Sequence, residues 1–384
     1  MRQLGPEELE DILNGAAFFA SGGGGSRTLG ETLIQEILKI AGGVTLIDVT
    51  EVQPDDWGAV AAGIGAPNAT HDPQTGTYRI PKTYELLEQI LESPLRAFEL
   101  LSQTLQRKFS YTLSIEIGTG NIFVAMLVAA SKKLPVVDCD GAGRSVPELS
   151  MTTYAATGIS ISPFALASEK EPDIKAVLYA KTPADMEQLV RPIISTPEFG
   201  QLGGLATHAL DGQTMWNKKA VIPGTISVAQ ELGHLLRTAS DPVNAVLDFF
   251  RDTAFFLFRG TLKDVTEQTQ GGFDRGIVTL ENDGGEEVYV IYQNENLMAW
   301  RNDRPQPIAM APDLISYMTP EGLPLTNADN LKDRIGQELI LFGVQAREEL
   351  RQGSILAAFQ QALTTLGYYG PYVPIEYLNR YQKL

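Results

Sequence analysis

A run of ionisable side chains closes an apolar segment near the middle of the chain. Val136-Val137 leads into Asp138-Cys139-Asp140, and Gly141-Ala142-Gly143-Arg144 follows directly. The pattern predicts a buried strand that ends in two carboxyl groups, a thiol and a cation. Ligands of open α/β sheets bind outside the carboxyl ends of the strands. We therefore predict an active site here, with Asp138, Asp140 and Arg144 as catalytic residues.

The predicted strand sorts these side chains onto two faces. Asp138 and Asp140 share one face and Cys139 lies on the other, because side chains alternate along a strand. The two aspartates are then roughly 7 Å apart. This is too far to share one proton directly, as the dyad of an aspartic protease does. The spacing suits two separate roles, or two ligands around a metal or a substrate ring. Arg144 supplies a fixed positive fork for a carboxylate or an imide oxygen.

Glu148 admits two interpretations. Ser145-x-x-Glu148 has the form of a capping box, with Pro147 in the first turn, and predicts a helix over 146–156. On that interpretation Glu148 is chiefly a helix cap. On the other it belongs to the site, and we include it among the predicted catalytic residues.

Two glycine-rich turns precede predicted helices. Gly22-Gly23-Gly24-Gly25 comes before an amphipathic helix over about 29–41, and Gly118-Thr119-Gly120-Asn121 opens a helix over 121–132. Consecutive glycines lose much conformational entropy on ordering, so an ordered turn indicates positive φ or a close approach of the backbone. Free N–H groups at a helix start bind anions. The predicted substrate-binding residues are Gly23, Gly24, Gly25, Gly118, Thr119, Gly120 and Asn121.

Each turn also has a plainer explanation. The first can be a flexible linker, and the second an ordinary loop between a strand and a helix. Neither turn has the spacing of a dinucleotide fingerprint or of a P-loop, so we predict no nucleotide cofactor.

A divalent metal such as zinc is an alternative way to use the same region. Its predicted ligands are Cys139, Asp140 and His208, since thiolate and imidazole favour zinc or a similar ion. The chain has only three histidines, His71, His208 and His234, so a site of three or four histidines is nearly excluded by count. Asp138 and Cys139 face opposite ways on a regular strand, so the strand must bend for both to bind one ion.

Composition narrows the class of protein. The 384 residues are enough for two domains. The net charge of −17 argues against nucleic acid and anionic membranes as partners. No signal peptide and no apolar run of about 18 residues is apparent. A single cysteine permits no intrachain disulfide and fits a reducing cytoplasm.

The order of patterns predicts two domains. Strand and helix patterns alternate over 44–156, which indicates an α/β domain with a mostly parallel sheet over residues 1–167. Ser93-Pro94 is expected to separate two helices over 82–91 and 94–108. After residue 168, short strands and turns predict an α+β domain over 168–384 with a sandwich or barrel-like β core. Asn282-Asp283-Gly284-Gly285 marks a hairpin there. The aromatic tail over 368–374 and 36 glycines favour a homo-oligomer.

Four motifs in order resemble one known family. They are the glycine tetrad, Gly118-Thr119-Gly120-Asn121, the strand end 138–144 with Pro147-Glu148-Leu149, and Ile222-Pro223-Gly224-Thr225-Ile226-Ser227. Together they resemble the S-methyl-thiohydantoin desulfurase family over nearly the whole chain. The resemblance implies an α/β domain followed by a domain with much β structure. It also implies a context shared with hydantoinase and oxoprolinase systems, which act on five-membered cyclic imides.

The activity implied by the resemblance is removal of sulfur from a thiohydantoin ring to leave a hydantoin. We therefore expect a hydrolase-type enzyme whose partner is a small cyclic imide. A carboxylate base that deprotonates water contributes roughly 10²–10⁴-fold. Backbone N–H groups, Arg144 or a metal can stabilise the developing negative charge. The alternative is a non-catalytic ligand-binding or regulatory subunit of a hydantoinase or oxoprolinase system. ATP-assisted ring opening would need a phosphate motif that the sequence lacks.

Overall fold

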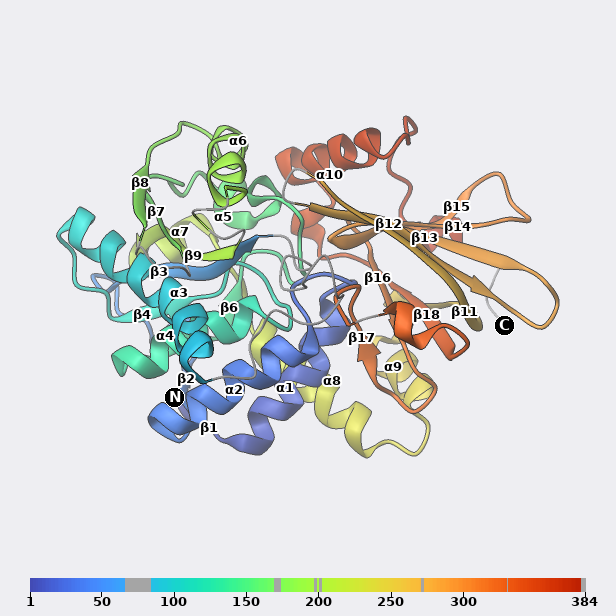
Figure 1. The fold of residues 1–384 in the computed structure, drawn as a ribbon, viewed down its shortest axis with the longest axis horizontal. Coiled ribbons are helices and arrows are strands. Elements are labelled where there is room, and N and C mark those ends of the chain that lie inside the picture. The colour runs from blue at the N-terminus through green and yellow to red at the C-terminus, as the bar shows by residue number, and fades with distance from the viewer. Residues whose placement is uncertain are drawn as a thin grey trace.

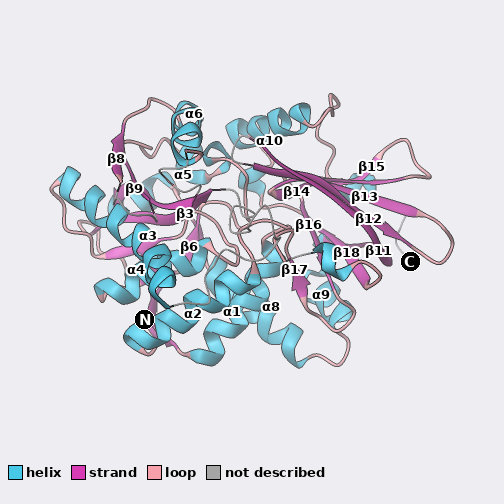
Figure 2. Ribbon diagram, in the orientation of Figure 1, coloured by secondary structure: helices cyan, strands magenta, loops and turns pink. Residues whose placement is uncertain are grey.

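The computed structural model describes residues 1–65, 84–168, 174–196, 199, 202–270, 273–329 and 331–380. Over these ranges the chain forms two eight-stranded sheets, each packed against helices. Figure 1 shows the first sheet and its helices on the left and the second sheet on the right, and Figure 2 shows the same view by secondary structure. His71 and the start of the helix predicted over 82–91 lie outside the described residues. No helix within the described ranges is both long enough and apolar enough to cross a membrane.

The first sheet is mixed, with parallel strands at its centre. Its order is β1-β2-β5-β4-β3-β9-β7-β8. Strands β2, β5, β4 and β3 run parallel, β1 is antiparallel to β2, and β9, β7 and β8 continue antiparallel from β3. The predicted α/β architecture is confirmed. The strands are β1 (Arg2–Leu4), β2 (Val44–Ile47), β3 (Trp57–Gly65), β4 (Tyr111–Leu113), β5 (Val136–Val137), β7 (Phe164–Ser168), β8 (Lys175–Leu178) and β9 (Leu202–Asp211).

Helices cover both faces of this sheet, and β3 shows how the sequence divides between them. Ala59 and Ala61 pack with α3 (Tyr84–Leu105) and α4 (Asn121–Lys132) on one face. Val60 and Ala62 pack with α6 (Pro183–Ile194) on the other, because residues two apart share a face of a strand. Further helices of this half are α1 (Pro6–Phe19), α2 (Arg27–Ala41), α5 (Thr153–Ala156), α7 (Gly212–Lys218) and α8 (Thr225–Thr238), with the 3₁₀ turns η1 (Val49–Glu51) and η3 (Leu149–Met151).

Two predicted helix patterns are wrong. The helix α3 continues through Pro94 instead of breaking at Ser93-Pro94. Strand β9 passes very close at this point: a Cβ on Gly204 would lie 2.1 Å from the Pro94 nitrogen, so a glycine is required there. The single helix predicted over 146–156 is replaced by η3 and α5. Ser145, the predicted cap of that helix, does not cap it: its hydroxyl donates to the Ile117 carbonyl at 2.8 Å.

The second sheet is antiparallel and curls. Its order is β15-β14-β13-β12-β11-β18-β16-β17, and β14 near one end of this order contacts β16 near the other. The prediction of a β-rich, barrel-like core is confirmed, and the hairpin turn forms with Gly285 N donating to Asn282 O at 3.0 Å. The strands are β11 (Ala254–Gln270), β12 (Phe273–Glu281), β13 (Glu287–Gln293), β14 (Glu295–Arg301), β15 (Pro307–Met310), β16 (Leu314–Met318), β17 (Pro324–Leu325) and β18 (Glu338–Val344).

The remaining helices surround the second sheet. Tyr372, from the aromatic tail, donates its hydroxyl to Asp313 Oδ2 at 2.8 Å, whereas Tyr369 is exposed. The tail therefore packs partly on its own domain. These helices are α9 (Pro242–Phe250), α10 (Gly353–Thr365) and α11 (Ile375–Leu378), with the 3₁₀ turns η4 (Arg251–Thr253), η5 (Leu331–Arg334) and η6 (Glu348–Leu350).

The two halves share a hydrophobic core. Helices α1 and α8 cross closely, since a Cβ on Gly15 would lie 1.8 Å from the Ala229 carbonyl oxygen. Their apolar residues pack in one cluster with Leu314, Ile340 and Phe342 of the second sheet. Strands β8 and β9 follow residue 168 in the sequence and still belong to the first sheet. The first sheet therefore draws on both predicted ranges, 1–167 and 168–384, and the position of the domain boundary stays a prediction.

Candidate active site

A cavity of about 180 Å³ lies where the first sheet, α2, α4 and the turn between β13 and β14 meet. This volume has room for several waters or a small organic ligand. It is below the roughly 300–1,000 Å³ of drug-sized ligand pockets. The cavity therefore has room for a small ring. Its charged lining residues are Glu116, Glu148, Glu187, Arg191 and Glu295.

The two predicted glycine turns lie against each other at this cavity. Gly120 N donates to Gly24 O at 2.7 Å, and the Thr119 hydroxyl donates to Gly25 O at 2.5 Å. A Cβ on Gly24, whose φ is +68°, would lie 2.9 Å from Gly118 Cα, so glycine is needed for this contact. Of the seven predicted substrate-binding residues, Gly24, Gly25, Gly120 and Asn121 line the cavity and Gly23, Gly118 and Thr119 do not.

Glu295 reaches the cavity from the second sheet. Its Oε1 accepts from Gly24 N at 3.1 Å, and its Oε2 has no hydrogen-bond partner although the residue is only 2% exposed. The backbone fixes this approach, since Asn296 N donates to Ser21 O and Asn327 N donates to Gly22 O, each at 2.6 Å. Burial, and then the nearby charge of Glu116, raises the pKa of Glu295 well above its usual value. Burial therefore favours the protonated form of Glu295.

Glu116 is a second buried carboxyl, and both of its oxygens are bonded. Oε1 accepts from Asn121 Nδ2 at 2.7 Å and Oε2 accepts from Val146 N at 2.6 Å. Asn121 is held in turn, because its Oδ1 accepts from Gly63 N at 2.9 Å. Burial raises the pKa of Glu116 to about 7, against the lowering effect of these hydrogen bonds. The carboxyl group thus has a fixed orientation and changes charge near neutral pH.

Glu148 is the predicted catalytic residue that lines the cavity. It is half-buried and its side chain caps no helix, so the capping interpretation is wrong. Burial, and then the charge of Glu187, raises the pKa of Glu148. The charge of Arg191 opposes this shift. Arg191 Nε also donates to Glu187 Oε1 at 2.6 Å, and the guanidinium lies 4.1 Å from the centre of the Phe273 ring.

Asp138 and Asp140 do not line the cavity. The strand breaks at Asp138, between β5 and β6 (Cys139–Asp140), and β6 pairs with β10 (Ile222–Pro223). Asp138 Oδ1 accepts from Ile226 N at 2.9 Å and from Ser227 N at 3.1 Å, so it caps α8. Both Asp140 oxygens accept from Gly143 N at 2.9 Å, and burial raises the pKa of this carboxyl to about 7. The two hydrogen bonds that Asp138 accepts from the start of α8 give it a structural role.

Arg144 is also outside the cavity lining. It is 2% exposed, and its Nη1 donates to the carbonyls of Pro312 and Asp313 at 2.8 and 2.9 Å. Burial lowers the pKa of the guanidinium to about 10, while the charges of Glu295, Asp313 and Glu116 oppose that shift. Arg144 therefore binds the turn between β15 and β16 to the first domain, and its charge lowers the pKa values of Glu116 and Glu295.

The predicted metal ligands are not gathered into one group. Cys139 is a free, buried thiol, as expected, and burial raises its pKa. His208 is buried with its ring stacked on Tyr154, 5.3 Å between ring centres, and burial lowers its pKa to about 4. Within the described ranges, one group of three metal-binding side chains has ligand atoms within 4.8 Å, and it contains none of Cys139, Asp140 and His208. Binding of zinc or another divalent ion stays a prediction.

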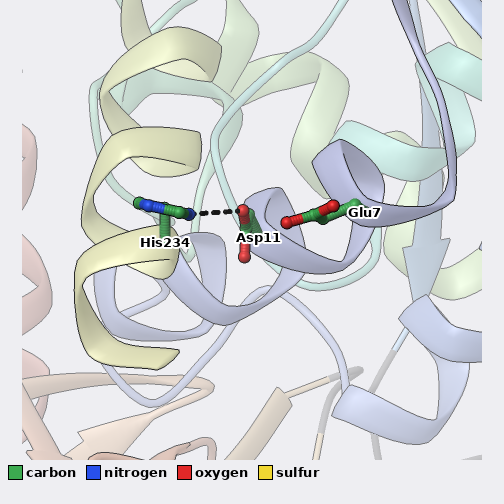
Figure 3. Close-up of side chains that lie close together, drawn as sticks. All are labelled: Glu7, Asp11 and His234. Carbon is green, nitrogen blue, oxygen red and sulfur yellow. Dashed lines mark hydrogen bonds and ion pairs between the residues drawn. The ribbon is translucent and has the colours of Figure 1, made fainter. Parts of the chain in front are cut away.

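That group joins α1 to α8 and consists of Glu7, Asp11 and His234. Figure 3 shows His234 pointing at Asp11, with 3.3 Å between Nδ1 and Oδ2. Arg237 already provides a cation here: its Nε donates to Asp11 Oδ1 at 2.7 Å and its Nη2 to Glu7 Oε1 at 2.8 Å. The cluster therefore acts as a clamp between two helices.

Sequence reasoning missed four charged residues of the cavity: Glu116, Glu187, Arg191 and Glu295. Glu116 carried a usable signal, because it ends a predicted strand directly before the Gly118 turn, as Asp138 ends the next one. Glu295 carried none. It lies in Asn294-Glu295-Asn296, which resembles any polar hairpin turn until the structure places it against the glycine loop.

The fold and cavity define a class of two-domain protein, in which an α/β domain and an antiparallel β domain together surround a small cavity lined by carboxyl groups. Family models for S-Me-THD-like proteins match this chain, the N-terminal domain over residues 7–175 and the C-terminal domain over residues 181–375. The chain therefore belongs to the S-methyl-thiohydantoin desulfurase family.

A solved structure supports the same fold over the whole chain. The crystal structure of a protein from Chromobacterium violaceum is 32% identical and superposes with a TM-score of 0.80, covering 98% of this chain and 100% of that one. No curated protein matches this chain.

Proposed function

We propose that this protein is a hydrolase that removes sulfur from a thiohydantoin-like five-membered ring in the cavity. One observation carries the proposal: Glu116, Glu148 and Glu295 line one small cavity, and the pKa of each is raised by burial. Perturbed carboxyl groups in a cleft are typical of acid–base catalysis. Membership of the family supports a thiohydantoin-related substrate.

Different roles for two of these carboxyls follow from their environments. Glu295 is the more deeply buried and its pKa is raised well above the usual value, so it is the acid. Glu148 is half-buried and closer to solvent, so it is the base. Glu116, fixed by Asn121 and Val146, holds the shape of this end of the cavity.

In the first step, Glu148 takes a proton from water as the water oxygen bonds to the ring carbon that carries sulfur. The C=S double bond opens, and the sulfur takes the proton of Glu295. In the second step, the new hydroxyl returns a proton to Glu295 and becomes the ring carbonyl. The C–S bond breaks, and the leaving HS⁻ takes the proton held by Glu148. The products are a hydantoin and H₂S, and both carboxyl groups are regenerated.

The proposed steps use carboxyl groups and water alone. Elemental analysis of the purified protein tests the zinc prediction separately. A homo-oligomer and a reducing cytoplasmic setting also remain proposals. They rest on the aromatic tail and on the single cysteine, Cys139.

Sulfide release from a thiohydantoin tests the proposal. Glu295→Gln and Glu148→Gln should each lower kcat by roughly 10²–10⁴-fold, the usual contribution of a general acid or base. Glu338→Gln is the matched control: it makes the same chemical change at an exposed carboxyl paired with Arg259, and should leave kcat unchanged. Full activity of Glu295→Gln would overturn the assignment.

The alternative function uses the same cavity without chemistry. A ligand-binding or regulatory subunit of a hydantoinase or oxoprolinase system would bind the ring and release no sulfide. Binding without turnover by the wild-type protein would therefore replace the enzyme proposal with this one.

A further inference from the structure

We propose that the part of the cavity between α2 and α4 is a subsite for an alkyl substituent on the bound ring. The ring and its orientation rest on the proposed function. The subsite follows from the residues that the two helices place on the cavity wall. The expected ligands are therefore hydantoin-type rings that carry an aliphatic side chain, such as the isobutyl group of leucine.

The wall on this side of the cavity is apolar. Four side chains of α2 and α4 form it: Leu29, Leu33, Val124 and Leu127. Residues three or four apart lie on the same face of a helix, so each helix turns one apolar face to the cavity. Among the described lining residues of these two helices, Asn121 alone is polar, and its side chain is bonded to Glu116 and to Gly63 N. Beyond Asn121 the wall therefore consists of hydrocarbon.

The apolar wall and the charged residues lie at different ends of the cavity. Asn121, the first residue of α4, donates to Glu116. Leu127 follows two turns later, about 9 Å along the helix at about 1.5 Å per residue. Glu187 and Arg191 come from α6, which packs on the opposite face of the first sheet from α4. A ligand that spans the cavity therefore meets charge at one end and hydrocarbon at the other.

The proposed reaction orients the ring between these ends. Glu148 is held beside α6, since the next residue, Leu149, donates its N–H to Glu187 Oε2 at 3.0 Å. Glu148 acts at the ring carbon that carries sulfur. On the opposite side of a thiohydantoin ring lie the carbonyl carbon and the tetrahedral carbon that bears the side chain in rings made from amino acids. A ring whose sulfur lies at Glu148 therefore directs this side chain toward α2 and α4.

The chemistry of the wall favours an alkyl side chain. Transfer of apolar surface out of water is favourable, and each buried methylene group should tighten binding about fourfold. An isobutyl group that is only partly buried should therefore still gain at least about tenfold. An amide of the same shape would lose its hydration at this wall and find no partner there. Shape alone would not separate these two groups, whereas an apolar subsite does.

Titration calorimetry with three neutral rings tests the proposal. The probes are hydantoin, 5-isobutylhydantoin and 5-(carbamoylmethyl)hydantoin, whose side chains are those of glycine, leucine and asparagine. We expect the isobutyl ring to bind at least about tenfold more tightly than hydantoin, and the carbamoylmethyl ring to bind no more tightly than hydantoin. A smaller gain for the isobutyl ring, an equal gain for the carbamoylmethyl ring, or failure of all three rings to bind would overturn the proposal.

A variant of the wall makes the reciprocal change in the protein. Leu29 is half-buried, and Leu29→Asn keeps a branched side chain of similar size while making it polar. It should reduce the preference for the isobutyl ring over hydantoin by at least about threefold. Leu189→Asn is the matched control, because it makes the same change at a leucine that is 47% exposed and does not line the cavity. The control should keep the preference.

A second variant covers the case in which Leu29→Asn does not fold. Leu29→Ala removes most of the apolar side chain and adds no polar group, and it should reduce the same preference. An unchanged preference in whichever variant folds would contradict the proposal.

The outcome is distinct from that of the proposed function, because all three rings carry oxygen where the substrate carries sulfur. A preference for the isobutyl ring in a protein that releases no sulfide from thiohydantoins would refute the enzyme and leave the subsite standing. Sulfide release by a protein that gains nothing from the isobutyl group would refute the subsite alone.

Discussion

Replacing Asp140 by Asn should weaken the dependence of stability on pH. Asp140 is fully buried and has a pKa of about 7, against 3.8 for an exposed aspartate. Asn keeps the shape and one oxygen to accept from Gly143 N, which lies 2.9 Å from the carboxyl oxygens. The substitution therefore removes the titration and retains the local hydrogen bond.

The sign follows from which state holds the proton. Between pH 3.8 and about 7, folded Asp140 is protonated and the unfolded residue is ionised. The folded state is thus favoured at low pH, and its advantage falls as pH rises, by about 1.4 kcal/mol per pH unit. From about pH 5.5 to about pH 7 this amounts to about 2 kcal/mol. Loss of the Asp140 charge also lowers the pKa of Glu116, which adds to the effect.

Urea denaturation at about pH 5.5 and about pH 8 measures the difference, and both values lie above the sequence pI of about 4.7. The wild-type protein should lose about 2 kcal/mol more of its free energy of unfolding than Asp140→Asn over this range. Equal losses in the two proteins would show that Asp140 is ionised throughout. The burial argument, and the raised pKa derived from it, would then be wrong.

Two further substitutions test the structural roles of residues first predicted to be catalytic. Asp138→Ala should lower the free energy of unfolding by about 1–2 kcal/mol through loss of the α8 cap, and sulfide release per folded molecule should not change. Unchanged stability with lost turnover would show instead that Asp138 is catalytic. Arg144→Met should lower the free energy of unfolding, measured in urea, by about 3–5 kcal/mol. It leaves the carbonyls of Pro312 and Asp313 without their donor and the buried glutamates without this cation. A change below about 1 kcal/mol would show that Arg144 has no structural role.

Features that depend on neighbouring residues were predictable from the sequence. The helix over 121–132 has the bounds of α4, since its apolar residues and the preceding glycine mark it locally. The hairpin turn at Asn282 formed as predicted for the same reason. Both glycine turns were predicted to bind the substrate, and in the structure they contact each other, since Gly120 N donates to Gly24 O.

Features set by distant parts of the chain were not predictable. Asp138 caps α8, a helix that begins 87 residues later, and no local sequence pattern predicts this role. Arg144 donates to the carbonyls of Pro312 and Asp313, in the turn between β15 and β16. Burial decides whether a charged residue serves packing or chemistry, and burial depends on the whole fold. For that reason the strand end at 138–144 suggested a site, whereas the cavity carboxyls Glu116 and Glu295 were overlooked.

The glycine loop, Gly22–Gly25, fits closely against the turn between β13 and β14, and this fit limits how members of the family can diverge. A Cβ on Gly22 would lie 2.5 Å from Asn296 Oδ1, and one on Gly23 would lie 1.9 Å from Glu295 Oε1. The two domains are matched by separate family models, yet a side chain at Gly22 or Gly23 would displace the side chain of Asn296 or Glu295. Recombination that joins an N-terminal half from one lineage to a C-terminal half from another would put mismatched partners at this contact. The two halves should therefore be inherited together, with substitutions at Asn294–Asn296 compensated in the glycine loop.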